Sequence, residues 1–276
     1  MEPLGATASV IAVAGLAAQS ARAVYQLMDG LIEAPHAIAN SKTLVAGTQD
    51  SLNSLAGTLT TSPDTQARFG SVLRSIDLEK TLKSTQELCD RFHTAITGYT
   101  RHSTDARFSN RDRMLVNLHE QQIAQFNNQL SGCQRTISLV IETITLIVTY
   151  RISSDVAELS ARLQAQEQAL SALATELARA STSLKSIENT IEDKQTSFER
   201  FTILQNTCEA TRKATQAQRT GQTFGDMQID QSFAVQGIVG EAQRGVDQSF
   251  GRLLAQNRSR GFHGQMDAAS FARMFG

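Results

Sequence analysis

The chain has 276 residues, of which 41% are hydrophobic, 19% are charged and 5% are aromatic. A chain of this length can bury the core of one large domain or of two smaller ones. Its formal net charge of -1 provides no field that would attract a phosphate backbone, so we expect no nucleic-acid partner.

The first segment, residues 5–29, combines the composition of a packed helix with the length of a membrane span. No charged residue lies between positions 3 and 21, but the many alanines make the segment only weakly hydrophobic. We expect the packed N-terminal helix of a bundle, and the alternative is a helix that leaves the bundle and enters a bilayer. In either case the residues that pack or insert are Leu4, Val10, Ile11, Val13 and Leu16.

Three further helices are expected before residue 150. Pro35 is placed to open the first of them. The tetrapeptide TSPD at 61–64 signals the start of the second, which ends near Gly98. The third begins near Asp112 and is apolar nearly all round in the segment TISLVIETITLIVTY, so it should be the most buried helix. The apolar residues at helical spacing in the second helix are Phe69, Val72, Leu73, Ile76, Leu82, Cys89, Phe92 and Ile96.

A regular heptad pattern runs through residues 154–218. Because the register continues without a slip, we expect one long helix that packs on the bundle or forms a coiled coil with another molecule. Gln166, Ala180 and Lys194 weaken every second position of one apolar set, which favours a seam that can exchange partners. The candidate self-association seam consists of Leu163, Leu170, Leu173, Leu177, Leu184, Ile187 and Ile191.

The last segment, residues 220–276, differs in composition from the rest of the chain. It holds nine of the seventeen glycines and six of the twelve phenylalanines, and it contains two approximate copies of about 26 residues, TFGDMQIDQSFAVQGIVG and SFGRLLAQNRSRGFHGQM. We expect a mobile tail that adds little structure, and the alternatives are a short appendage packed on the bundle or an assembly motif, since segments of this kind can stack as cross-β. The candidate assembly motif consists of Phe224, Gly225, Gly237, Phe250, Gly251 and Gly264.

No pattern in the sequence supports catalysis, cofactor binding or a metal site. The five histidines lack a zinc-binding spacing, and the chain has neither a phosphate-binding glycine motif nor a GxSxG elbow. Cys89 and His93 lie one helical turn apart, but a pair on an apolar stripe predicts core packing. We therefore expect no enzymatic activity, no catalytic residue, no cofactor and no metal.

The cysteines and the N-terminus indicate where the protein resides. Cys89, Cys133 and Cys208 are odd in number and far apart, which argues against disulfides and for a reducing compartment. The first residues lack the basic segment of a signal peptide. We expect a cytoplasmic protein, with membrane association only on activation.

The opening MEPLGATASVIAVAGLAAQSARAVYQLMDGLIEAPHAI resembles the start of a fungal family named after the azaphilone pigments biosynthesis cluster protein L. That family is related to the HeLo-like N-terminal domains of fungal NOD-like receptors. The resemblance is specific over about the first 40 residues, and the helix pattern fits as far as about residue 215. It implies an all-helical, non-enzymatic domain that serves signalling, self-association or membrane-directed cell death.

Together these features predict an all-α protein in three parts. Residues 1–150 form a helical bundle, 151–219 a long heptad helix, and 220–276 a low-order Gly/Phe-rich tail. We expect an interaction and self-assembly protein whose partner is another protein or a second copy of itself. The resemblance implies an accessory or regulatory role in secondary metabolism, or a signalling adaptor. The alternative is a cell-death effector whose first helix enters membranes after templating by an amyloid-like tail.

Overall fold

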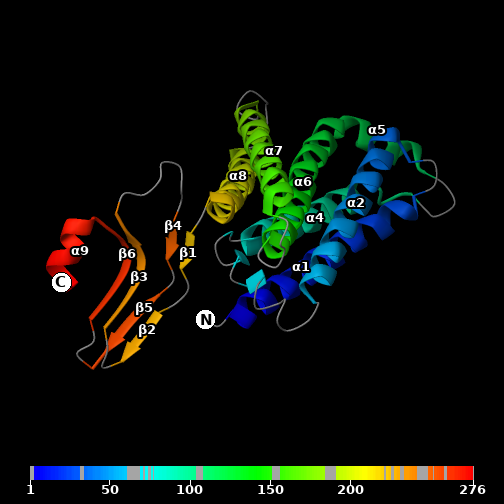
Figure 1. Cartoon of the computed structure of the whole chain (residues 1–276). Coiled ribbons are helices and arrows are strands. Elements are labelled where there is room, and N and C mark those ends of the chain that lie inside the picture. Colours follow the sequence, from blue (N-terminus) through cyan, green and yellow to red (C-terminus); the bar gives the residue numbers. More distant parts are fainter. Residues whose placement is uncertain are drawn as a thin grey trace.

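The described residues as far as 220 are mainly helical, and the strands and one short helix follow. The computed structural model describes residues 3–31, 34–60, 69–70, 72–73, 76, 78–103, 108–150, 156–183, 191–220, 222–224, 227–230, 233–240, 248–250, 252–257 and 260–275. In Figure 1 the helices form one body, and the strands lie apart from it beyond the end of the last long helix.

The helical body confirms the prediction of an all-α bundle. Helices of 22 residues or more dominate it, and among the elements with described bounds α5 is short, as is α9, which follows the strands. The helices of the described residues are α1 (Pro3–Asp29), α2 (His36–Leu59), α4 (Leu78–Tyr99), α5 (Asn110–Leu118), α6 (Glu120–Tyr150), α7 (Val156–Ser183), α8 (Ile191–Thr220) and α9 (Ala268–Phe275).

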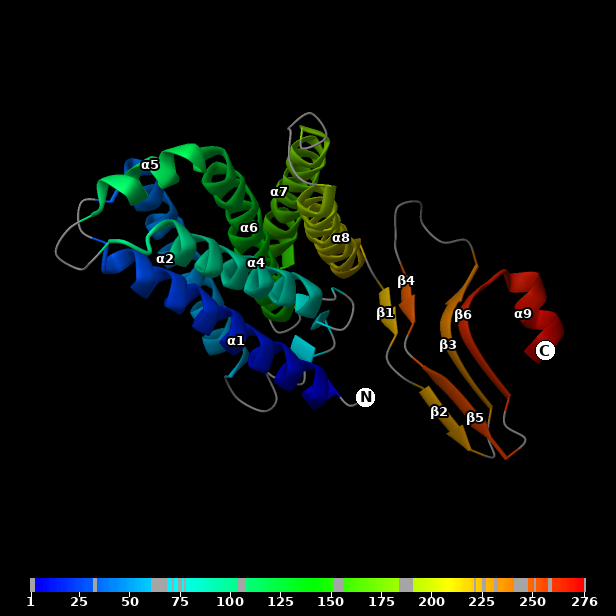
Figure 2. The same ribbon diagram turned by 180° about the vertical axis from the view of Figure 1, so that it is seen from behind.

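Helix α6 lies at the centre, as its nearly uninterrupted apolar composition predicted. It contacts α2, α4, α7 and α8, and its buried residues cover most of its circumference, whereas Arg135, Glu142 and Thr145 lie on an exposed stripe. Figure 2 shows α7 and α8 on one side of it and α2 on the other, with α4 lying between it and α1. A helix that is apolar over most of its circumference must be covered by several other elements, because those faces would otherwise expose hydrocarbon to water.

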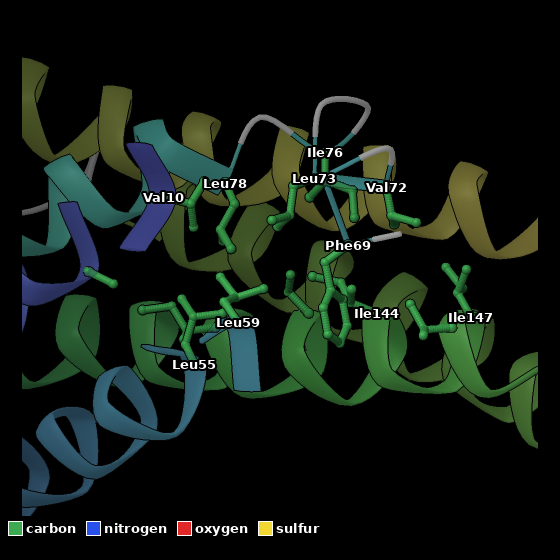
Figure 3. Close-up of a cluster of buried hydrophobic side chains, with 14 of the residues drawn as sticks. Val10, Leu55, Leu59, Phe69, Val72, Leu73, Ile76, Leu78, Ile144 and Ile147 are labelled. Atoms are coloured by element: carbon green, nitrogen blue, oxygen red, sulfur yellow. The ribbon is translucent and has the colours of Figure 1, made fainter. Parts of the chain in front are cut away.

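The first core cluster fills the space between α1, α2 and α6 (Figure 3). Val10 of α1 and Leu55 and Leu59 of α2 belong to this cluster, and Phe69, Val72, Leu73 and Ile76 lie on its opposite side from Ile144 and Ile147 of α6. All the apolar residues that the helical spacing singled out between 69 and 96 are buried. The start signal at 61–64 lies outside the described residues.

The second core cluster joins α6 to α7 and α8 through a close approach at Gly132. A Cβ at this position would lie 3.1 Å from Leu177 Cδ2 and 3.3 Å from Leu204 Cδ1. Glycine therefore allows the three helices to pack closely, although it costs about 1 kcal/mol of helix propensity relative to alanine.

The heptad segment forms a hairpin of two helices instead of the single long helix expected over 154–218. α7 and α8 lie side by side as an antiparallel pair, which both views show (Figures 1 and 2). Heptad spacing reports which residues share one face of a helix, and a reversal of the chain leaves that spacing unchanged. In α8 the buried stripe moves to Phe201, Leu204 and Cys208, whereas Phe198 is 43% exposed.

The strands form three two-stranded parallel pairs after α8. β1 pairs with β4, β2 with β5 and β3 with β6, so each pair joins a strand of the first copy to one of the second. The low-order tail that we expected thus contains ordered strands. Their bounds are β1 (Gln222–Phe224), β2 (Met227–Asp230), β3 (Phe233–Val239), β4 (Gln248–Phe250), β5 (Leu253–Gln256) and β6 (Arg260–Met266).

Candidate assembly site formed by two paired strand repeats

The two copies recognised in the sequence lie one upon the other, strand for strand. Gln222 pairs with Gln248 and Met227 with Leu253, both at an offset of 26 residues, and Phe233 pairs with Arg260 at an offset of 27. Backbone hydrogen bonds also join the copies outside these ladders, from Met227 N to Arg252 O at 2.8 Å and from Gly240 N to Met266 O at 2.8 Å. The repeat is therefore a structural unit.

Like residues face like residues in the first strand pair. β1 reads Gln-Thr-Phe and β4 reads Gln-Ser-Phe, so the register places Phe224 on Phe250 and Thr223 on Ser249. In cross-β stacks, like segments pair in register in this way. Gly225 and Gly251, the other predicted members of the motif here, lie outside the described residues.

The two glycines of the long strand pair occupy matching positions because no other residue fits there. Gly237 pairs with Gly264, and both have φ of +152°, a conformation that residues with a side chain rarely adopt. A Cβ at Gly237 would lie 1.8 Å from the carbonyl oxygen of Gly264. These positions allow the two copies to approach each other along the whole strand.

The change of offset from 26 to 27 residues is absorbed in one turn. Two residues separate β2 from β3, and three separate β5 from β6. The extra residue accompanies Asn257, whose φ of 53° is tolerated by asparagine better than by most residues. Asn257 Nδ2 donates to Asp230 Oδ1 at 2.7 Å, which links the two copies at this turn.

The strand pairs also pack against each other. Ile229 of β2 is 3% exposed, and a Cβ added to Gly261 of β6 would lie 2.4 Å from its Cδ1. Gly261 therefore leaves the space that Ile229 fills. Neither residue was predicted from the sequence, although apolar and polar residues alternate in MQID, which is the period-two pattern of a strand.

The paired repeats expose apolar side chains and strand edges. Val239, Leu253 and Leu254 are between 37% and 43% exposed. Within the described residues each strand pairs with only one other, so β3 and β6 each present a second edge. An exposed edge is a template for another strand, and natural proteins usually protect such edges.

The residues singled out in the first helix divide between core and surface. Val10 and Val13 are buried against α2 and α4, Ile11 is partly buried, and Leu16 is 50% exposed. The side chain of Leu4 lies outside the described residues. Residues Thr7–Asp29 are long and apolar enough to cross a membrane, with a mean hydropathy of 1.3, but the core helix of a soluble protein passes the same test.

The candidate seam residues that the structure describes are taken up by the fold itself. Leu163 belongs to the first core cluster, and Leu170, Leu173 and Leu177 belong to the second. Leu184 and Ile187 lie outside the described residues, as does the side chain of Ile191. The strands thus replace the heptad seam as the candidate site of assembly.

The chemistry-bearing side chains of the described residues show no catalytic or metal-binding arrangement. Burial raises the pKa of the Cys89 thiol to about 12 and that of Cys208 to about 11, so both stay protonated at neutral pH. Cys133 is fully buried and its pKa is also raised. No group of three or more metal-ligating side chains is found in the part of the chain that the structure describes.

Comparison with known proteins adds one finding to this geometry. The family described as pigment biosynthesis cluster protein PigL N-terminal matches residues 1–217, which is the helical body without the strand repeats. No curated protein and no solved structure matches the chain. The match extends over most of the chain and agrees with the likeness noted at its N-terminus. The chain therefore belongs to the pigment biosynthesis cluster protein PigL N-terminal family.

Proposed function

We propose that this protein is a non-catalytic accessory of a pigment biosynthesis cluster that acts by self-assembly through its strand repeats. The family match supports the association with such a cluster. The pairing of two copies in parallel register, with Gly237 on Gly264, is the observation that carries the assembly role. One copy of the repeat already binds another copy within the chain, so a copy from a second chain meets the same chemistry.

The direction of growth follows from the order of the strands. The outer edge of β6 belongs to the second copy and the outer edge of β3 to the first. A second molecule can place its first copy on the second copy of the first molecule, and the contact then repeats without closing. A head-to-tail contact that does not close produces filaments.

The isolated pair of repeats has reason to add further copies. A two-stranded sheet alone is marginally stable in water, and each added strand satisfies another row of backbone groups. The seven residues of β3 include no charged side chain, so stacking places no like charges on each other there. The exposed Leu253 and Leu254 are covered when the next copy is added.

The experiment compares assembly of the full chain with that of Gly237→Ala. We expect wild-type protein to form fibres that bind thioflavin, grow from added seeds and diffract at about 4.7 Å along the fibre axis. Gly237→Ala should form none, because its Cβ would meet the Gly264 carbonyl. Gly57→Ala in α2 is the matched control, since no atom lies within 4 Å of its added Cβ. Wild-type chains that stay monomeric at high concentration would refute the proposal.

A second function, membrane entry by α1 after assembly, is supported by the exposed apolar surface of that helix. Leu16 is half exposed, and 33% of the most apolar stretch of α1 is buried. Leu16→Asp changes this surface without burying a charge in the bundle. We expect it to reduce dye leakage from liposomes exposed to growing fibres, with Leu118→Asp on α5 as the exposed-leucine control. Equal leakage by wild type and Leu16→Asp would exclude entry through α1.

The link to pigment formation has its own test in the producing organism. Deletion of the gene should change pigment yield, and Gly237→Ala should reproduce that change if assembly is required. Normal pigment after deletion would contradict the accessory role. Normal pigment with Gly237→Ala alone would separate that role from assembly.

A further inference from the structure

A buried arginine lies outside the strand repeats and has no part in the assembly role. Arg200 of α8 is 3% exposed, and its Nε donates to the Ser84 carbonyl oxygen at 3.4 Å and to Ser84 Oγ at 3.1 Å. Its Nη1 donates to Gln129 Oε1 of α6. All three acceptors are neutral, and no hydrogen bond from Nη2 is found among the described residues.

A charged guanidinium in such a place is costly. Burial of a charge is offset only where the charge is paired and its donors are satisfied. Burial and the nearby Arg91 both lower the pKa of Arg200, whereas Glu87 raises it. Glu87 makes no ion pair with it within the described chain, and its side chain is exposed. Among the residues that the structure describes, this cation therefore has no carboxylate in hydrogen-bond contact.

The guanidinium lines a cavity of about 180 Å³ between α4, α6 and α8. The stacked rings of Phe92 and Phe126, with centroids 3.5 Å apart, form part of an apolar wall. Arg91 adds a second positive charge, and no carboxylate is found among the described lining residues. A cavity of about 150 Å³ can hold benzene, so this one has room for a single-ring compound.

We propose that this cavity binds a small aromatic carboxylate, with its carboxylate on Arg200 and its ring against Phe92 and Phe126. Arginine matches the planar geometry of a carboxylate, and its hydrogen bonds to a charged acceptor are stronger than those to the neutral acceptors around it. The apolar wall disfavours inorganic anions, which would gain nothing from it. The two arginines exclude cations.

The main alternative is that Arg200 only ties α8 to α4 and α6. The two roles differ in what happens when the cavity is filled while Arg200 is left intact. Ala95 of α4 lines the cavity and is partly exposed, so Ala95→Leu places a larger side chain there. Ala172→Leu on the exposed face of α7 is the matched control.

The test titrates the full-length chain with benzoate, its neutral isostere benzamide and inorganic phosphate by calorimetry. We expect benzoate to saturate one site, benzamide to bind about tenfold more weakly or worse, and phosphate not to bind. Ala95→Leu should lose about tenfold or more in benzoate affinity, whereas Ala172→Leu keeps it. The proposal is overturned if wild type does not bind benzoate, if benzamide binds equally well, or if Ala95→Leu binds as wild type does. None of these readouts depends on fibre formation.

Discussion

Truncation of Leu170 tests whether the heptad leucines stabilise the bundle or await another molecule. Leu170 is fully buried in the second core cluster, between α7 and the helices that it packs on. Loss of its side chain removes apolar burial and leaves a cavity, and buried leucine-to-alanine changes cost about 2–5 kcal/mol. We expect Leu170→Ala to lower the free energy of unfolding by about 3 kcal/mol.

The assay is urea unfolding followed by circular dichroism at two protein concentrations tenfold apart. The Gly237→Ala background prevents strand assembly from adding a concentration dependence of its own. If the seam is internal, the midpoint falls in Leu170→Ala and does not change with concentration. A seam between molecules gives a midpoint that rises with concentration. Leu118→Ala, in which the exposed fraction of the leucine is 67%, should change the stability by about 0.5 kcal/mol or less.

Either of two results would contradict an internal seam. A loss in Leu170→Ala as small as that in Leu118→Ala would mean that α7 is not packed as the structure has it. A concentration-dependent midpoint in the same background would mean that α7 or α8 pairs with another chain. Either result would favour the self-association seam that the sequence predicted for the heptad leucines.

Two further measurements test the helical body. Asp112 is fully buried, which favours its neutral form, but hydrogen bonds from Ser103 and His102 outweigh this and lower its pKa. The stability that the ionised Asp112 contributes should therefore be fully present above the unfolded pKa of about 3.9, and it should be lost as the pH falls through the lower pKa of the folded protein. Asp112→Asn should lower the free energy of unfolding at neutral pH by about 1–3 kcal/mol, measured by denaturation. Because burial keeps Cys89 and Cys208 protonated, native protein should react with a thiol reagent far more slowly than protein in denaturant; rapid labelling of the native chain would contradict this.

The helices were predictable because their signal is local. Start signals and helical spacing place residues such as Leu73 and Ile144 on the apolar face of their own helix. An apolar face packs against the core, so the burial of these residues follows from the sequence. The hairpin of α7 and α8 was not predictable in the same way. Burial in α8 depends on Thr207, Thr211 and Thr215, small polar residues whose spacing of four marks a helical face without an apolar signal.

The assembly site was half predictable. The repeat of Phe224 at Phe250 and of Gly237 at Gly264 is visible in the sequence, and the structure pairs these same positions. The strands between them carry few repeated letters, because stacking needs compatible shapes and not identical residues. Arg200 gave no signal at all, since nothing in the sequence distinguishes a buried arginine from one on a solvated face.

The short connection between the helical body and the strands sets a limit on how molecules can stack. A single residue separates α8, which ends at Thr220, from β1, which begins at Gln222. The end of α8 is also held, because Arg219 pairs with Glu167 of α7 at 2.8 and 3.1 Å. The strands of each molecule are therefore tethered close to its helical body.

Each added molecule contributes two layers of strands, or about 9.5 Å of fibre length. A helical body of this size has a radius of gyration of about 17 Å, so bodies on successive molecules cannot lie directly above one another. The helical bodies must point in different directions around the fibre axis, or the contacts that hold the end of α8 must break. Ten Gly/Ser residues inserted after Gly221 relieve this crowding, and we expect seeded fibres to elongate faster than wild type by thioflavin kinetics. The same insertion between α4 and α5, after residue 105, is the control and should leave elongation unchanged. Slower growth with the longer tether would mean that the helical bodies contact one another in the fibre and that those contacts help to build it.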